Sequence, residues 1–114
     1  MFNFNSVQEI DVAELSEWLD SSEQDFRVVD VREIREQMQG LVPGSVTMPL
    51  ATLPVRLNEF SRDEKLVMVC RSGARSAQAC MYLKQQGFDN VYNLRGGIMG
   101  WAGNNMPISQ YNPA

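Results

Sequence analysis

The fold expected of this chain is decided by the stretch Leu66-Val67-Met68-Val69-Cys70-Arg71-Ser72-Gly73-Ala74-Arg75-Ser76. Its first four residues are apolar, which is typical of a short buried strand. Over residues 75–86 the apolar positions instead repeat at helical spacing, and Gly87 follows as a favourable residue after a helix C-terminus. The stretch therefore predicts a buried strand that passes through a tight loop directly into a helix.

Strand-like and helix-like segments alternate on both sides of this stretch. Asp11 and Glu14 have the spacing of a helix capping box, and apolar residues follow at helical spacing. Further short strands are expected at residues 26–31, 45–48 and 91–94. Further helices are expected at residues 33–39 and 53–60, and a last short one from Gly96 through Trp101. Strands separated by helices predict an α/β fold with a mainly parallel central sheet and helices on both faces. We expect one domain over residues 1–114, with its core at about 7–101 and a polar surface tail at 103–114.

Composition excludes several kinds of function. The chain has 114 residues, a net charge of −4 and no histidine. The charge argues against nucleic-acid binding, and the absence of histidine excludes Ser-His and Cys-His catalysis. Residues 1–6 lack the features of a signal peptide, and no apolar run is long enough to span a membrane. The two cysteines, Cys70 and Cys80, form no CxxC pair. We therefore expect a cytoplasmic protein with reduced thiols, without a metal, a cofactor or a membrane partner.

Cys70 is the candidate for the chemistry because it directly follows the most strand-like run. In parallel α/β sheets, ligands bind beyond the carboxyl ends of the strands. Free backbone amides at the start of the next helix, the curl that Gly73 permits, and the charges of Arg71 and Arg75 all favour a thiolate. The same surroundings suit a persulfide, whose outer sulfur is also negative. The alternative is a buried, inert cysteine, and this is the interpretation that we favour for Cys80, on the inner face of its helix.

Four motifs, in order along the chain, resemble the single-domain rhodanese family of sulfurtransferases. They are Asp30-Val31-Arg32 followed by Glu33 and Glu36, the turn Gly40-Leu41-Val42-Pro43-Gly44-Ser45, the loop from Cys70 to Ser76, and Gly96-Gly97 followed by Trp101. One departure is Leu41, where the family often has histidine. The resemblance covers about residues 7–101. It implies transfer of a sulfane sulfur from a donor such as thiosulfate to cyanide or a thiol, with Cys70 as the persulfide carrier.

Two other functions remain possible for this loop. Cysteine phosphatases and arsenate reductases also hold an anion on strand–loop–helix amides, but their signature has one more residue between cysteine and arginine than the four found here. A smaller ring of amides suits one sulfur atom better than a tetrahedral oxyanion. A non-catalytic rhodanese-like binding or persulfide-carrier module is the other alternative. Such modules typically lack the cysteine, and Cys70 is present.

The other residues of the loop are expected to support the sulfur. The binding loop comprises Arg71, Ser72, Gly73, Ala74, Arg75 and Ser76. Arg71 is expected at the pocket rim, where it either attracts an anionic donor or is a solvated charge. Ser76 is expected to cap the helix or to bond within the loop. The donor and acceptor are expected to be small molecules, or a protein that bears a persulfide or a thiol.

Two ion pairs are expected behind the loop. Asp30 ends its own strand at the same edge of the sheet, so we predict that it pairs with Arg75. Arg32 and Glu36 are spaced to pair across one helical turn, although a solvated helix face is the simpler interpretation. Asp30 and Arg32 are thus assigned supporting roles. Trp101 is expected in the core or in the pocket wall.

Overall fold

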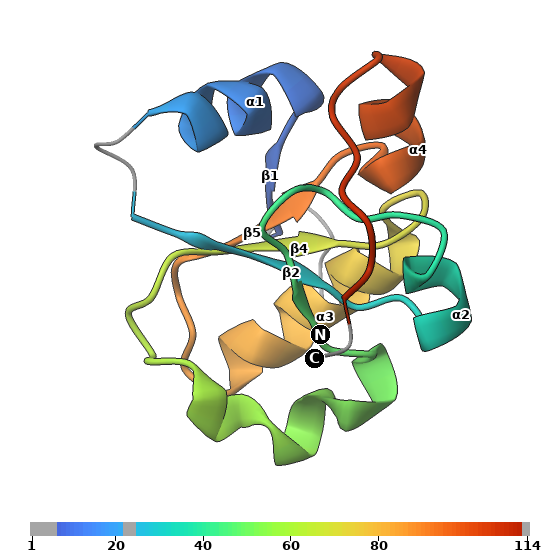
Figure 1. Cartoon of the computed structure of the whole chain (residues 1–114). Helices are drawn as coiled ribbons and strands as arrows, with labels where there is room; N and C mark the ends of the chain where they lie inside the picture. The colour runs from blue at the N-terminus through green and yellow to red at the C-terminus, as the bar shows by residue number, and fades with distance from the viewer. Residues whose placement is uncertain (1–6, 22–24, 113–114) are drawn as a thin grey trace.

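The computed structural model describes residues 7–21 and 25–112, and there five strands form one sheet (Figure 1). They are β1 (Gln8–Ile10), β2 (Arg27–Asp30), β3 (Val46–Thr47), β4 (Leu66–Val69) and β5 (Val91–Leu94). Their order across the sheet is β1-β5-β4-β2-β3, and every neighbouring pair is parallel. The predicted α/β fold with a parallel sheet is confirmed.

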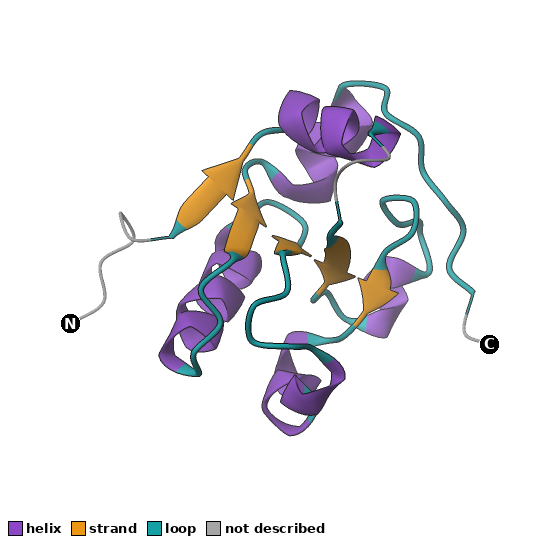
Figure 2. Cartoon of the chain, turned by 90° about the vertical axis from the view of Figure 1, so that its left-hand side faces the viewer, coloured by secondary structure: helices purple, strands orange, loops and turns teal. Residues whose placement is uncertain are grey.

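Helices cover both faces of this sheet (Figure 2). They are α1 (Val12–Asp20), α2 (Ile34–Gln37), α3 (Ala74–Gln85) and α4 (Gly97–Gly103), with two 3₁₀-helices, η2 (Leu50–Val55) and η3 (Leu57–Glu59). One buried apolar cluster joins α3 and η2 to one face, and a second cluster joins α1 and α4 to the other. Trp101 is only 1% exposed in the second cluster, so its predicted core position is confirmed. In the described part of the chain, no helix has the length and apolar character to cross a membrane.

Helix α1 begins as its sequence predicts. Asp11 Oδ1 accepts a hydrogen bond from the backbone N–H of Glu14 at 2.8 Å, and Glu14 Oε1 accepts one from the N–H of Asp11 at 3.1 Å. These bonds satisfy two backbone donors that the first turn leaves without partners. Strand β1, just before this cap, was not predicted. Only Ile10 of its three residues is buried, so the sequence has no apolar run or alternation there.

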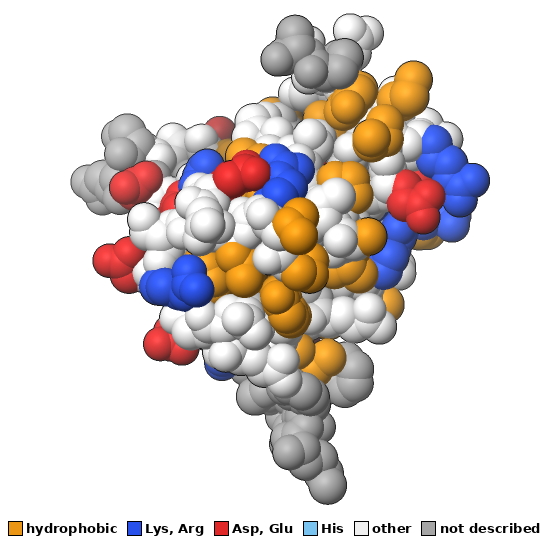
Figure 3. Space-filling view, turned by 90° about the horizontal axis from the view of Figure 1, so that it is seen from below, with side chains coloured by type: hydrophobic (Ala, Val, Ile, Leu, Met, Phe, Trp, Pro, Cys, Tyr) orange, Lys and Arg blue, Asp and Glu red, His pale blue; other side chains and the backbone are white. Residues whose placement is uncertain are grey.

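The helix predicted at residues 53–60 is wrong in type and in limits. The structure has two short 3₁₀-helices instead, and the backbone N–H of Arg56 donates to the carbonyl of Leu53 at 3.1 Å. Pro54 has no N–H and lies inside η2, so it cannot contribute to an α-helical ladder. The expected apolar contacts still form, because Leu53 and Phe60 are buried in the same cluster. Val55 of η2 is nevertheless 85% exposed. Hydrophobic side chains gather on the face of the molecule that is seen from below in Figure 3.

The end of the chain returns towards the turn at residues 40–44. Leu41 and Ser109 exchange two backbone hydrogen bonds of 2.8 Å, and the indole N–H of Trp101 donates to the carbonyl of Pro107 at 2.6 Å. These bonds hold the tail against the domain. Residues 113–114 of the predicted tail, and residues 1–6, in which we expect no signal peptide, lie outside the described residues.

The register of the sheet brings the candidate site together. Asp30 in β2 is paired with Val69 in β4, and Met68 in β4 with Asn93 in β5. Because these strands are parallel, their carboxyl ends meet at one edge. Cys70 follows Val69 directly and therefore lies between the ends of β2 and β5.

Candidate active site

The base of the Cys70 loop is attached to helix α4. The backbone N–H of Ile98 donates to the carbonyl of Cys70 at 2.9 Å, and that of Met99 donates to the carbonyl of Arg71 at 3.0 Å. Gly97 makes this approach possible, because a Cβ atom there would lie 2.4 Å from the carbonyl oxygen of Arg71. The Gly96-Gly97 motif thus has a structural role, because it lets α4 fix the start of the loop.

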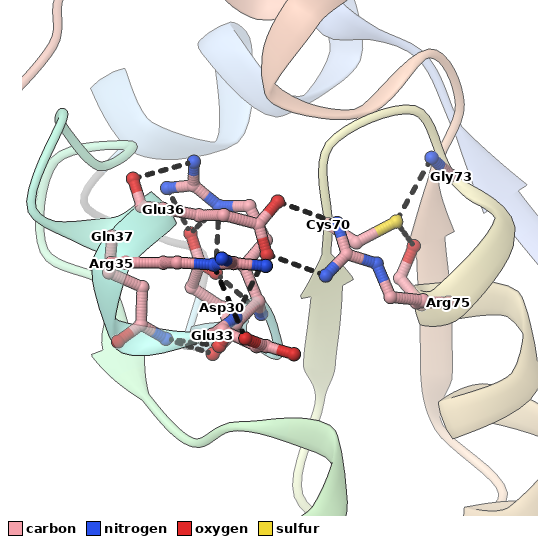
Figure 4. Close-up of polar contacts among 10 residues, drawn as sticks. Asp30, Glu33, Arg35, Glu36, Gln37, Cys70, Gly73 and Arg75 are labelled. Atoms are coloured by element: carbon pink, nitrogen blue, oxygen red, sulfur yellow. Dashed lines mark hydrogen bonds and ion pairs between the residues drawn. The ribbon is translucent and has the colours of Figure 1, made fainter.

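Hydrogen-bond donors surround the sulfur of Cys70, whose residue is only 1% exposed. The N–H of Gly73 lies 3.1 Å from Sγ, and the hydroxyl of Ser76 lies 3.3 Å from it (Figure 4). Gly73 has φ +110°, a left-handed conformation that turns the loop into α3. The predicted curl around the sulfur is confirmed.

The net effect of these surroundings is to lower the pKa of Cys70. Burial alone raises the pKa, but hydrogen bonds from the Ser76 hydroxyl and from the amides of Ser76, Gly73 and Ser72 outweigh it. Neutral hydrogen-bond donors are therefore the main cause of the lowered pKa. The sequence suggested that Arg71 and Arg75 contribute as well. Cys80 differs, because burial raises the pKa of its thiol to about 12. It is fully buried in the core, as predicted.

The predicted ion pair between Asp30 and Arg75 is wrong. Arg75 reaches across to α2 and forms a two-point salt bridge with Glu36, at 2.6 and 2.8 Å (Figure 4). A hydrogen bond from Arg75 lowers the pKa of Glu36 to about 2, and the same bond raises the pKa of Arg75. The sequence predicts for Glu36 only a possible pairing with Arg32, because it does not show that α2 faces α3.

Asp30 instead pairs with Arg32, two residues further along the chain. The carboxylate accepts the backbone N–H of Arg32 at 2.9 Å and its guanidinium at 2.9 to 3.1 Å. The guanidinium also donates to the carbonyls of Gly40 and Glu36, at 2.6 and 3.1 Å. Arg32 is 5% exposed, so the solvated helix face expected for it is wrong. The pair fixes the chain on either side of α2, and with it the position of Glu36.

Two further residues support this region that the sequence motifs do not include. The Gln37 side chain is buried and donates to the carbonyls of Asp30 and Arg32, at 3.1 and 2.9 Å. Asn93, 2% exposed in β5, hydrogen-bonds the hydroxyl of Ser76. For Asn93, the available signal was a polar residue inside an otherwise apolar strand, because buried polar groups are normally hydrogen-bonded.

A cavity of about 710 Å³ adjoins the loop. It is lined by α2, α4 and the tail, with Arg71 at the loop and Ile98, Met99 and Ile108 as apolar walls. Arg71 is exposed there, as predicted for a residue at the pocket rim. Among the described residues, no group of three or more potential metal ligands of the His, Cys, Asp and Glu types comes together.

Comparison with known proteins gives consistent matches over most of the chain. A family model for the rhodanese-like domain matches residues 11–104. A sulfurtransferase of Allochromatium vinosum is 47% identical over 102 residues, covering 90% of this chain and 94% of that protein. The thiosulfate sulfurtransferase GlpE of Pseudoalteromonas translucida is 32% identical, covering 84% of this chain and 90% of its own. The crystal structure of a rhodanese-like domain protein from Staphylococcus aureus has a TM-score of 0.83 at 31% identity, covering 93% and 100% of the two chains.

Proposed function

Since this chain belongs to the rhodanese-like sulfurtransferase family, we propose that it moves a sulfane sulfur from a donor such as thiosulfate to a thiophilic acceptor through a persulfide on Cys70. The observation that carries the proposal is the buried Cys70 sulfur with hydrogen-bond donors aimed at it, at the end of β4. A thiolate is the nucleophilic form of cysteine, and these donors favour it without a general base.

The reaction has two displacement steps. In the first, the Cys70 thiolate attacks the outer sulfur of thiosulfate, the donor S–S bond breaks, and sulfite leaves with the electron pair. In the second, the acceptor attacks the outer sulfur of the persulfide, and the electron pair of that bond returns to Cys70 as thiolate. With cyanide as the acceptor, the product is thiocyanate. No oxidant or reductant is consumed.

Different residues of the loop have different roles in these two steps. The amides of Ser72, Gly73 and Ser76 and the Ser76 hydroxyl stabilise negative charge on sulfur in both steps. Arg71, exposed in the cavity wall, attracts the anionic donor. Ala74 is the first residue of α3 and is exposed.

Behind the loop, two ion pairs hold its position. The Arg75–Glu36 pair connects α3 to α2, and the Arg32–Asp30 pair connects the segment before α2 to the end of β2.

The proposed donor and acceptor are small molecules, or a protein that bears a persulfide or a thiol. We propose that the reaction takes place in the cytoplasm.

Mass spectrometry after treatment with thiosulfate tests the proposal. We expect the peptide that contains Cys70 to gain one sulfur atom, and cyanide to remove it with formation of thiocyanate. Cys70→Ser should abolish both signals, whereas the matched variant Cys80→Ala should retain them because Cys80 is buried in the core. An adduct on Cys80, or none with any donor of a panel of thiosulfate and organic persulfides, would contradict the assignment.

An aryl phosphate serves as the comparison substrate. The short loop is expected to give negligible hydrolysis. Turnover that is robust in the wild type and lost in Cys70→Ser would favour a phosphatase instead.

A further inference from the structure

Asn93 lies at the centre of a buried hydrogen-bond network behind the Cys70 loop. Its Nδ2 group donates to Glu9 Oε2 at 3.0 Å and to the carbonyl of Gly73 at 3.2 Å. On its other side, Oδ1 accepts a short hydrogen bond of 2.5 Å from the hydroxyl of Ser76. Asn93 is 2% exposed and Ser76 is fully buried, so water does not compete for these groups.

The orientation of the Asn93 amide follows from its partners. A carboxylate and a backbone carbonyl only accept hydrogen bonds, so the NH₂ group must face Glu9 and Gly73. The carbonyl oxygen Oδ1 therefore faces Ser76. Because Oδ1 cannot donate, Ser76 must be the donor in that bond.

Ser76 has a single proton but two neighbours that can accept it. Its Oγ atom lies within hydrogen-bond distance of Asn93 Oδ1 and of Cys70 Sγ. A neutral Cys70 thiol can donate its own S–H to Oγ, which leaves the hydroxyl proton for Asn93. A Cys70 thiolate has no proton to give and can only accept. The Ser76 hydroxyl can stabilise this thiolate only if its proton turns to sulfur, and the buried Oδ1 of Asn93 then loses its donor.

We propose that Asn93 is a positioning residue that competes with the Cys70 thiolate for the single proton of Ser76. This inference deepens the proposed function, because it rests on Cys70 as the sulfur carrier. In the persulfide the negative charge moves to the outer sulfur, and Ser76 turns back to Asn93. Asn93 thus favours the protonated and the sulfur-loaded forms over the bare thiolate.

Charged groups around the loop come from several elements. Arg75 of α3 is paired with Glu36 of α2, Glu9 of β1 is paired with Arg95, and Arg71 is exposed in the loop. Among the described residues, Glu9 is hydrogen-bonded to Asn93, and the Asn93 amide connects it to the carbonyl of Gly73 in the loop. The substitutions below leave the charge of each of these groups unchanged, so they isolate the hydrogen bonds.

The test is the pH dependence of Cys70 alkylation by iodoacetamide in the full chain, with the adduct located by mass spectrometry. Asn93→Ala should lower the pKa of Cys70 and speed alkylation about tenfold at pH values below the pKa, since one pKa unit is a tenfold change in the thiolate ratio. In a Ser76→Ala background the same substitution should change nothing. Asn90→Ala, the same chemical change outside the network, is the matched control.

Three results would overturn the inference. The first two are an unchanged pH profile of Cys70 alkylation in Asn93→Ala and a raised pKa of Cys70 in that variant. The third is an effect of Asn93→Ala that persists in the Ser76→Ala background, which would show that Asn93 acts through the Gly73 carbonyl. If Asn93→Ala fails to fold, an NMR measurement on the wild-type chain still tests the inference. The ¹³C resonance of the Asn93 side-chain carbonyl should titrate together with Cys70, and a resonance that does not move with Cys70 refutes the competition. Both measurements are independent of sulfur transfer, so a failure of the proposed function would be distinguishable.

Discussion

Ser76→Ala should make Cys70 a weaker acid and a slower nucleophile. The Ser76 hydroxyl lies 3.3 Å from Sγ, and in the described part of the chain it is the one side-chain donor that hydrogen-bonds this sulfur. A hydrogen bond to a charged group contributes about 1.5–3 kcal/mol, and about 1.4 kcal/mol corresponds to a tenfold change in an ionisation equilibrium. Loss of the hydroxyl should therefore reduce the thiolate fraction by roughly 10- to 100-fold at pH values below the pKa. The lower end is expected, because Asn93 competes for the same proton.

The assay is the rate of Cys70 alkylation between acidic and alkaline pH, together with sulfur transfer from thiosulfate to cyanide at neutral pH. Both rates should fall in Ser76→Ala and recover as the pH is raised above the new pKa. Ser72→Ala is the matched control, since its hydroxyl is exposed while its backbone amide, which bonds Cys70, is retained. If Ser76→Ala left the profile unchanged, or moved it to lower pH, the assignment of the hydroxyl as a thiolate donor would be refuted.

Three further predictions concern the surroundings of the loop. Arg71→Ala should raise the KM for thiosulfate several-fold with a smaller effect on kcat, and steady-state kinetics should show this difference shrinking at high salt; a change confined to kcat would contradict it. Glu36→Gln should lower stability at neutral pH, because the pKa of Glu36 is lowered from 4.5 to about 2 in the folded chain. The contribution of the ionised Glu36 to the free energy of unfolding is fully present above pH 4.5 and is lost as the pH falls through about 2. Urea unfolding curves of the variant and the wild type should therefore converge between pH 4.5 and about 2, and should remain apart above pH 4.5. Gly97→Ala should cost on the order of 3 kcal/mol in urea unfolding, since its Cβ would meet the Arg71 carbonyl, whereas Gly100→Ala, with its nearest contact at 3.7 Å, should be neutral or stabilising.

Apart from β1, the strands of the sheet and the sulfur loop were predictable because their signals are local. The run Leu66–Val69 is apolar and buried on both faces of the sheet, as central strands of parallel sheets are. The loop after it is specified by a glycine with positive φ and by the helix that follows. Each of these features depends on residues that are close in sequence. The order of elements then leaves little choice of topology.

The ion pairs behind the loop were not predictable in the same way. Asp30 and Arg75 do lie at the same edge of the sheet, as expected. The Asp30 carboxylate, however, is hydrogen-bonded to Arg32, which is only two residues away in the chain. Arg75 is then matched by Glu36, which the short helix α2 directs across to α3. Long side chains from separate elements can reach several partners, and only the packing of α2 selects among them.

The charges at this site are divided so that the anionic donor we propose could approach a chain of net charge −4. Of the two arginines in the loop, Arg75 is neutralised by Glu36, and among the described residues Arg71 has no salt-bridge partner. In the proposed mechanism, Arg71 supplies the positive charge for an incoming anion, while neutral amides and one hydroxyl stabilise the charge on sulfur. Neutral donors stabilise a thiolate without pairing with the donor anion, so binding and nucleophile activation can be altered separately. Arg71→Ala and Ser76→Ala should accordingly have nearly additive effects on kcat/KM, and strong coupling in the double variant would contradict this separation.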